Sequence, residues 1–242
     1  MKIPILYEDK DVIVINKPAG LNVHPDGKAK EKTLVDWIVK KYPSAKNVGE
    51  PMVLENGTKI ARPGIVHRID RDTTGCLIIA KNKKAYEFLK EQFQSRKVRK
   101  VYHAFVYGSI KEDRGMIDRA IGRSPNDIRK WSAQRGARGE MRDAVTYFKV
   151  LNRKNNVTFI EAMPKTGRTH QIRVHFLALN HPVVHDTLYA SRFFLEQRNW
   201  LGFKRLALHA RELEITLPSG KLMDIVAPYP KDFEDAVKKI QK

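Results

Sequence analysis

Cysteine is almost absent from this 242-residue sequence, in which Cys76 is the only one. A single cysteine forms no internal disulfide and excludes a zinc site built on several cysteines. Cys76 lies within the apolar segment CLIIA, so we expect it to pack as a small hydrophobic side chain. The sequence also lacks an apolar run long enough for a signal peptide or a membrane span, which predicts a cytoplasmic protein with no membrane partner.

Motifs that hold metals or nucleotides are missing as well. His181 and His185 have the spacing of a helical metal pair, but Pro182 follows the first directly and no glutamate lies between them. His170 and His175 are five residues apart, which places them on different faces of a helix. No glycine-rich phosphate loop of standard spacing is present. We therefore expect neither a metal nor a nucleotide cofactor.

Acidic residues are too few to balance the basic ones. The sequence has 27 Asp and Glu against 46 Lys and Arg, which gives a formal net charge of +19. Such a charge predicts attraction to polyanions, and nucleic acid is favoured because no strongly amphipathic basic helix indicates a membrane surface. The apolar fraction of 42% is ordinary for a globular protein of one large domain or two small ones.

Most of the apolar segments have the pattern of strands rather than helices. Strands are expected over ILYE and VIVINK, CLIIAK, VYHAFVYG, VTYFKVLN and VTFIEAMP, and over a hairpin, LALHARELEITLPSGKLMDIVAP, that turns at Pro218–Gly220. Consecutive strands outnumber regular strand–helix alternations. This organisation predicts an α+β fold with a largely antiparallel sheet.

Four segments have helical periodicity. They are TLVDWIVKKYP after Thr33 as N-cap, THQIRVHFLALN from near Thr169, KDFEDAVKKIQK, and KKAYEFLKEQFQSRK with a stripe of Ala85, Phe88, Leu89, Gln92 and Phe93. Residues 45–63 are polar, contain Pro and Gly, and are expected to form a loop.

The segment GIVHRIDRDTTGCLIIAK places charged residues directly before a buried strand. If residues 66–70 are extended, Arg68 and Asp70 lie on the same side, and Asp70 stands at the mouth of a cleft. A nearby arginine favours the ionised carboxylate, which can act as a nucleophile or a base. The alternative is a turn in which Asp70 or Asp72 binds its own backbone.

Two further segments carry candidate site residues. Arg173 lies near the start of a helix, where a cation gains nothing from the helix dipole, so either an external anion or a carboxylate partner is expected, with a plain surface arginine as the alternative. Tyr102 lies on a predicted strand, where it can stack on a flat base or serve as a core tyrosine.

Taken in order, these segments resemble a known family. The motifs are NKPAG at 16–20, VHRIDRDTTG at 66–75, KVYHAFVYG at 100–108, GRTHQIRVH at 167–175, HPVVHDTLY at 181–189 and LHARELEITLP near the C-terminus. They resemble the ordered motifs of the RluA family of pseudouridine synthases, and the resemblance covers Ile5 to Pro228. It implies the pseudouridine-synthase α+β fold, with a mixed, mainly antiparallel sheet, flanking helices and a central catalytic cleft.

The resemblance also implies an activity and its residues. The family converts uridine in RNA to pseudouridine without a cofactor or metal. Its invariant aspartate maps onto Asp70, its active-site tyrosine onto Tyr102 and its active-site basic residue onto Arg173, which would keep Asp70 anionic. The arginine that helps to replace the extruded base maps onto Arg68. The other substrate-binding candidates lie in the same motifs: His67, Thr74, Arg168, His170 and Gln171.

The implied substrate must be turned out of its helix before it can react. The excess of Lys and Arg offsets the energy of base flipping through phosphate contacts. Large-subunit ribosomal RNA is the favoured substrate, with transfer RNA as the alternative. Whether Asp70 attacks the sugar or removes a proton at C2′ stays open.

Some features depart from the family or leave alternatives. His185 stands where the family usually has Gly, which is expected to reshape the loop without touching a mapped catalytic residue. We expect a monomeric, single catalytic domain over residues 1–242, without the S4-type domain of many relatives, so target choice is assigned to the basic stretch 119–142. That stretch is alternatively an ordinary solvated hairpin. A non-catalytic RNA-binding or ribosome-assembly factor would not need the trio, and a glycosylase would need a water-activating group that the sequence does not show.

Overall fold

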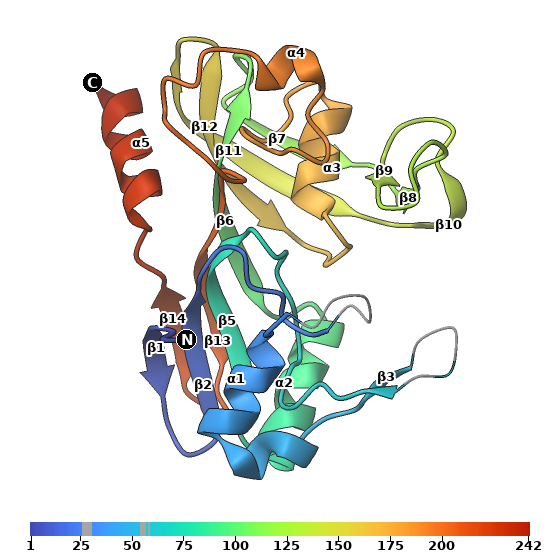
Figure 1. Cartoon of the computed structure of the whole chain (residues 1–242), viewed down its shortest axis with the longest axis vertical. Helices are drawn as coiled ribbons and strands as arrows, with labels where there is room; N and C mark the ends of the chain where they lie inside the picture. Colours follow the sequence, from blue (N-terminus) through green and yellow to red (C-terminus); the bar gives the residue numbers. More distant parts are fainter. Residues whose placement is uncertain (26–30, 54–56, 58) are drawn as a thin grey trace. The chain divides into compact units, whose positions relative to one another are not determined.

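The computed structural model describes residues 1–25, 31–53, 57 and 59–242, and the chain divides into two compact units (Figure 1). One unit consists of Met1–Arg99 and Glu212–Pro228, and the other of Lys100–Arg211 and Tyr229–Lys242. Strand β13 (Leu208–Thr216) crosses the boundary between them. Both units are built on strands with flanking helices, so the predicted α+β class is confirmed. That the whole chain acts as one catalytic domain stays a prediction.

The first unit is built on the strand order β1-β2-β5-β13, with β14 (Leu222–Val226) paired to β13. Strands β1 (Ile5–Glu8), β2 (Val12–Lys17) and β5 (Thr74–Ala80) form antiparallel pairs. Every residue of β5 is buried, as its unbroken apolar sequence predicts. Cys76 packs within this strand and is 2% exposed, which confirms its expected role as a small buried side chain.

Two helices of the first unit begin where the sequence indicates. Helix α1 (Leu34–Lys41) follows Thr33, and the carboxylate of Asp36 accepts a hydrogen bond from the Thr33 amide at 2.7 Å. Helix α2 (Lys83–Gln94) is capped by the side chain of Asn82, which accepts from the Ala85 amide.

The buried stripe of α2 was predicted only in part. Ala85, Leu89 and Gln92 are buried as expected, but Phe88 is 36% exposed and Tyr86 is buried instead. The reason is tertiary, because the amide of Glu50 donates to the Tyr86 hydroxyl at 3.3 Å and so brings a distant segment over this side of the helix.

The prediction of a loop over residues 45–63 is wrong in two places. A 3₁₀ turn covers Pro43–Asn47, and β3 (Met52–Val53) pairs with β4 (Lys59–Ile60). Residues 54–56 and 58 of the predicted loop lie outside the described residues. Strands of two residues are too short to produce a hydropathy period, which is why the sequence did not reveal them.

The second unit contains the strand order β6-β12-β11-β7, in which β6–β12, β12–β11 and β11–β7 are antiparallel pairs. The strands are β6 (Arg99–Tyr107), β7 (Arg114–Asp118), β11 (Val145–Lys154) and β12 (Val157–Pro164). The tight turn between β11 and β12 consists of Asn155 and Asn156, with φ of 47° and 56°. Asparagine tolerates this left-handed backbone better than most residues, so these two residues suit a tight turn between the expected strands VTYFKVLN and VTFIEAMP.

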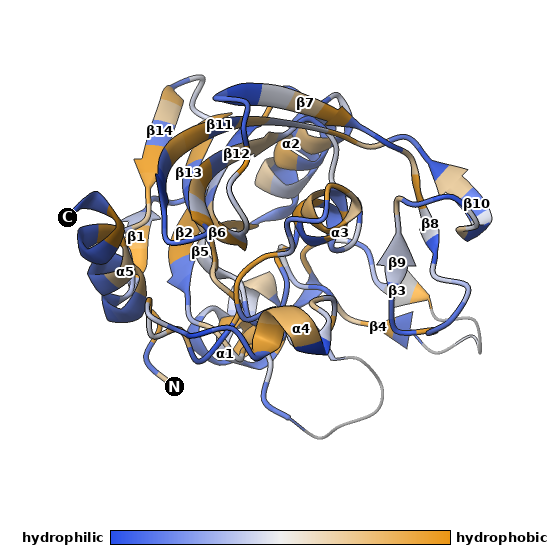
Figure 2. Ribbon diagram, turned by 90° about the horizontal axis from the view of Figure 1, so that it is seen from above, coloured by the Kyte–Doolittle hydropathy of each residue, from blue (hydrophilic) through white to orange (hydrophobic). Residues whose placement is uncertain are grey.

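Helices complete the second unit around an aromatic core. Helix α3 (Gln171–Ala178) is buried on nearly every side, the short α4 (Arg192–Leu195) is exposed, and α5 (Lys231–Gln241) is amphipathic. Figure 2 shows the apolar and polar sides of α5 in contrasting colours. Its apolar side presents Phe233, which contacts the rings of Phe105 and Phe203 at centroid distances of 5.1 and 5.6 Å. No helix in the described part of the chain is long and apolar enough to cross a membrane.

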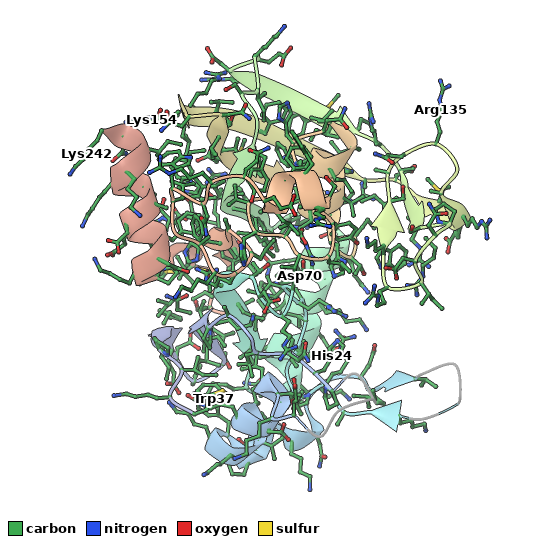
Figure 3. The ribbon with its side chains drawn as sticks, turned by 45° about the horizontal axis from the view of Figure 1, so that its top comes forward. His24, Trp37, Asp70, Arg135, Lys154 and Lys242 are labelled. Carbon is green, nitrogen blue, oxygen red and sulfur yellow. The ribbon has the colours of Figure 1, made fainter. Side chains whose placement is uncertain are left out.

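The basic stretch 119–142 forms a small sheet rather than a single hairpin. Strands β8 (Ile121–Arg123), β9 (Trp131–Ser132) and β10 (Arg138–Arg142) pair in the order β10-β8-β9 (Figure 1). Figure 3 shows Arg135, in the connection between β9 and β10, pointing away from the ribbon. The long basic sequence is therefore a folded and exposed element.

We predict that Gly64→Ala strongly destabilises the protein. Gly64 has φ of +66°, and an added Cβ would overlap the carbonyl oxygen of Ala80 in β5. The left-handed backbone alone costs about 1–2 kcal/mol, and displacement of a buried strand raises the loss above about 3 kcal/mol. Urea denaturation measures the loss. Gly220→Ala is the matched control, because Gly220 has φ of +85° with nothing within 4 Å, and an equal loss in both variants would contradict the packing argument.

Candidate active site

Asp70 lies in a turn that leads directly into the buried strand β5. The amide of Thr73 donates to the Asp70 carbonyl at 3.2 Å, and β5 begins at Thr74, which is 4% exposed. Asp70 itself is half-buried. The backbone of Asp70 is thus attached to the core on its C-terminal side, as the sequence predicts.

A buried lysine fixes the other side of this turn. Lys17 is fully buried at the end of β2, and its Nζ donates to the carbonyl oxygens of Pro18, Leu21 and Arg71 at 2.8–2.9 Å. An ammonium group has three donors, and here three carbonyls accept from them. Because Arg71 follows Asp70 directly, Lys17 joins the NKPAG motif to the HRID motif. The sequence showed both motifs but not their contact.

His67 and Arg68 come just before the turn and lie in different environments. His67 Nε2 accepts the amide of Ile78 at 3.0 Å, and its ring stacks on Phe93 with centroids 4.4 Å apart. These contacts make His67 a brace between β5 and α2. The exposed Arg68 has Nη1 3.2 Å from His24 Nε2. That His67, Arg68 and Thr74 bind substrate stays a prediction.

Tyr102 lies on β6 in the second unit, opposite Ala162 of β12. Its ring is half-buried and packs against the aromatic core. One side of the ring is therefore supported by a rigid sheet, which suits a stacking platform. Stacking on a base stays a prediction.

Arg173 has the carboxylate partner that its position requires. Its Nε and Nη2 donate to the two carboxylate oxygens of Asp186 at 2.7 and 2.8 Å, and both side chains are at least nine-tenths buried. The guanidinium also lies over the ring of Tyr189, 4.9 Å from its centroid. Sequence reasoning missed Asp186, although it lies within the quoted HPVVHDTLY motif. A pairing of Arg173 with Asp70 stays a prediction.

The remaining candidates shape the entry to α3. Gln171 uses its whole amide within the protein: Nε2 donates to Val145 O and Thr146 Oγ1, and Oε1 accepts from Thr166 Oγ1 and the Arg168 amide. Such a side chain holds the loop in place. A substrate-binding role for Gln171 and for Arg168, whose Nε donates to Asp143 O, stays a prediction.

Helix α3 begins later than predicted. His170 is its N-cap, with φ of +55°, so the expected start near Thr169 is wrong by two residues, because a left-handed residue cannot be part of a right-handed helix. The ring of His170 is fixed by a contact of 2.8 Å between Nδ1 and the Tyr189 hydroxyl, and binding of substrate by His170 stays a prediction.

The backbone conformation of His185 accounts for the glycine that the family usually has at this position. Its φ is +57°, a left-handed conformation in which glycine is the least strained residue. This chain adopts the left-handed conformation with a histidine, and Asp186 follows it directly. The substitution is compatible with the Arg173–Asp186 pair.

Two other histidines are held neutral by burial. Burial lowers the pKa of His103 to about 4, although the nearby Glu161 acts in the opposite direction. Burial also lowers the pKa of His175, which contacts Thr146 Oγ1 and the Arg119 carbonyl. Across the described ranges, no group of three or more His, Cys, Asp or Glu side chains is placed to hold a metal ion.

The chain is similar to known proteins over nearly its whole length. The family model of RNA pseudouridylate synthase matches residues 11–178. An uncharacterized RNA pseudouridine synthase of Synechocystis is 39% identical over 95% of this chain and 66% of its own length. The ribosomal large subunit pseudouridine synthase D of Xanthomonas campestris is 38% identical over 95% of this chain and 67% of its own length. This chain thus spans about two thirds of those two relatives.

A solved structure has the same fold. The human RNA pseudouridylate synthase domain containing 1 matches with a TM-score of 0.74 and 28% identity, covering 95% of this chain and 84% of that one. Fold and motifs define an α+β protein of the pseudouridine-synthase type. The chain belongs to the RNA pseudouridylate synthase family, and the resemblance seen in its sequence is confirmed.

We predict that Lys17→Met lowers the free energy of unfolding by about 3 kcal/mol, because the carbonyls of Pro18, Leu21 and Arg71 all lose the buried ammonium that donates to them. Chemical denaturation measures the change. Lys10→Met, at an exposed position of the same unit, is the control and is expected to have little effect. Equal stability of the Lys17→Met variant and the wild type would show that Lys17 does not hold the turn.

We predict that Asp186→Asn destabilises the protein by about 3 kcal/mol, because it removes the charge of Asp186 from a buried two-bond pair with the Arg173 guanidinium. The chain supplies a matched control. Arg129 and Asp127 form the same two-bond pair, but the Arg129 side chain is 75% exposed. Exposed pairs contribute little, so Asp127→Asn should hardly change the unfolding midpoint. Comparable shifts in the two variants would refute the importance of burial.

Proposed function

We propose that this protein is an RNA pseudouridine synthase that isomerises uridine in structured RNA. The carrying observation is the family match over residues 11–178, which includes the motif segments of Asp70, Tyr102 and Arg173. Each of these residues is supported by rigid structure: Asp70 by the Lys17 turn and β5, Tyr102 by its sheet, and Arg173 by Asp186.

The chemistry assigned to these residues needs no added co-reactant. The N1–C1′ bond of the flipped nucleotide breaks, the uracil turns over, and a C5–C1′ bond forms. The C5 proton leaves to solvent and N1 gains a proton, so atoms balance. Asp70 acts on the sugar as nucleophile or as base at C2′, Tyr102 stacks on the uracil, and Arg173 favours the anionic form of Asp70.

Large-subunit ribosomal RNA is the proposed substrate. The similar protein of Xanthomonas campestris is named for the ribosomal large subunit, and this chain has a net charge of +19, which suits a densely charged RNA. Transfer RNA is the second candidate. We further propose that the protein works as a monomer in the cytoplasm, without a metal or cofactor.

We predict that Asp70→Asn abolishes tritium release from RNA labelled at uridine C5. Formation of the C5–C1′ bond displaces the label to water, so release reports the reaction directly. The rate should fall about 10³-fold or more, while RNA affinity stays within about threefold of wild type. Asp72→Asn, the neighbouring exposed acid, is the control and should keep wild-type release.

Separate large-subunit ribosomal and transfer RNA substrates identify the target in the same assay. Release by the wild type from ribosomal RNA alone supports the proposed substrate, and release from transfer RNA alone assigns the second candidate. RNA binding without release from any RNA supports a non-catalytic factor. Undiminished release by Asp70→Asn removes Asp70 from the mechanism.

A further inference from the structure

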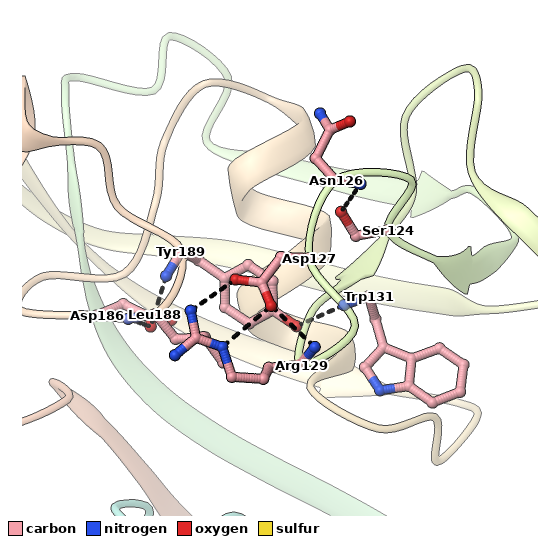
Figure 4. Close-up of polar contacts among 8 residues, drawn as sticks. All are labelled: Ser124, Asn126, Asp127, Arg129, Trp131, Asp186, Leu188 and Tyr189. Atoms are coloured by element: carbon pink, nitrogen blue, oxygen red, sulfur yellow. Dashed lines mark hydrogen bonds and ion pairs between the residues drawn. The ribbon is translucent and has the colours of Figure 1, made fainter.

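Tyr189 connects two parts of the second unit that the sequence did not relate. Its ring lies beneath the Arg173 guanidinium, and its amide donates to Asp186 Oδ1 at 3.2 Å. Its hydroxyl accepts the amide of Trp131, at the start of β9, at 3.0 Å (Figure 4). The side chain is 6% exposed, so one buried residue contacts both the predicted active-site arginine and the basic sheet.

The contact at Trp131 reaches a basic hairpin that is held together by its own contacts. The amide of Ser124 donates to Lys130 O at 3.0 Å and closes the turn between β8 and β9. The Arg123 guanidinium stacks 4.2 Å from the centroid of the Trp131 indole. The tip exposes Ile128 to 85%. Because these contacts make the hairpin stiff, a force on its surface can reach the amide of Trp131.

The charge of this sheet suits an RNA backbone. Residues 119–142 carry only Asp127 and Glu140 as acids, against a larger basic set: Arg119, Arg123, Arg129, Lys130, Arg135, Arg138 and Arg142. Arg135 and Arg138 are exposed. A folded element with this excess of positive charge attracts phosphates.

The Tyr189 hydroxyl is fixed from two sides. It accepts from the Trp131 amide, and its own proton is available to His170 Nδ1 at 2.8 Å. His170 is the N-cap of α3, the helix that carries Arg173. The hydroxyl therefore joins β9 to the first turn of α3, while the ring supports the guanidinium.

We propose that Tyr189 is a positioning residue that couples RNA contact on the basic sheet to the orientation of Arg173. The inference rests on the proposed function and adds a role for the stretch 119–142. RNA bound to the sheet holds β9 against the Tyr189 hydroxyl. This contact in turn holds His170, α3 and the guanidinium, so productive binding and the geometry of Arg173 are linked.

Tyr189→Phe tests the hydrogen bonds of the hydroxyl separately from the packing of the ring, because it removes the hydroxyl and keeps the ring under Arg173. We expect kcat at saturating RNA to fall about tenfold, the size expected for one lost hydrogen bond in a buried network. The thermal midpoint should stay within a few degrees of wild type. Tyr147→Phe, at an exposed tyrosine of β11, is the matched control and should leave kcat unchanged.

A double-mutant cycle tests the coupling itself. The pair Arg135→Gln and Arg138→Gln removes two exposed charges from the sheet and should lower kcat/KM about tenfold in the wild type. In the Tyr189→Phe background the same pair should lower it threefold or less, because the path to Arg173 is already broken. In the Tyr147→Phe background the full tenfold loss should remain.

The outcomes distinguish the inference from the function on which it rests. Equal losses in all three backgrounds, with tritium released by the wild type, overturn the coupling and leave the proposed function intact. No release by the wild type from any RNA overturns both. A loss confined to the wild-type and Tyr147→Phe backgrounds supports Tyr189 as the link.

Discussion

A cation inside a protein must be surrounded by fixed oxygens, and this requirement organises both units of the chain. In the first unit, the buried ammonium of Lys17 gathers three carbonyls and thereby fixes the turn after Asp70. In the second, the buried guanidinium of Arg173 takes both carboxylate oxygens of Asp186. Neither cation tolerates displacement, because each donor that leaves its acceptor in the interior loses a hydrogen bond that water cannot replace. The candidate residues next to these two cations are therefore held in rigid surroundings.

The same requirement bears on two loops of the second unit whose backbones are left-handed at one residue each. His170 and His185 adopt left-handed conformations on the two segments that meet at Arg173 and Asp186. Such conformations persist only where the surrounding contacts hold them, and here the Tyr189 hydroxyl and the ion pair do so. The strained loop backbones therefore occur where the surrounding contacts also hold the guanidinium in one position.

The stretch 119–142 links this arrangement to the outside of the molecule. It is a folded three-stranded sheet with a large excess of basic residues, and the first residue of its strand β9, Trp131, donates its amide to the Tyr189 hydroxyl. An enzyme that acts on a long polyanion benefits if contact far from the reacting base also orders the reacting groups. Tyr189 has the position for that task, since its ring lies against the Arg173 guanidinium and its hydroxyl accepts from the first amide of β9.

The sequence by itself determined the α+β class, the starts of α1 and α2, the buried state of Cys76 and the family, because each depends on local pattern or on the order of motifs. It placed Asp70 before a buried strand, and it left open whether Arg173 has an external anion, a carboxylate partner or only a surface position. Only the tertiary structure decided that this carboxylate is Asp186, that Lys17 holds the Asp70 turn, that Tyr86 rather than Phe88 is buried, and that β3 and β4 interrupt the expected loop. The physical reason is that these contacts join residues far apart in the chain or involve strands of two residues. Neither leaves a recognisable pattern in the hydropathy of the sequence.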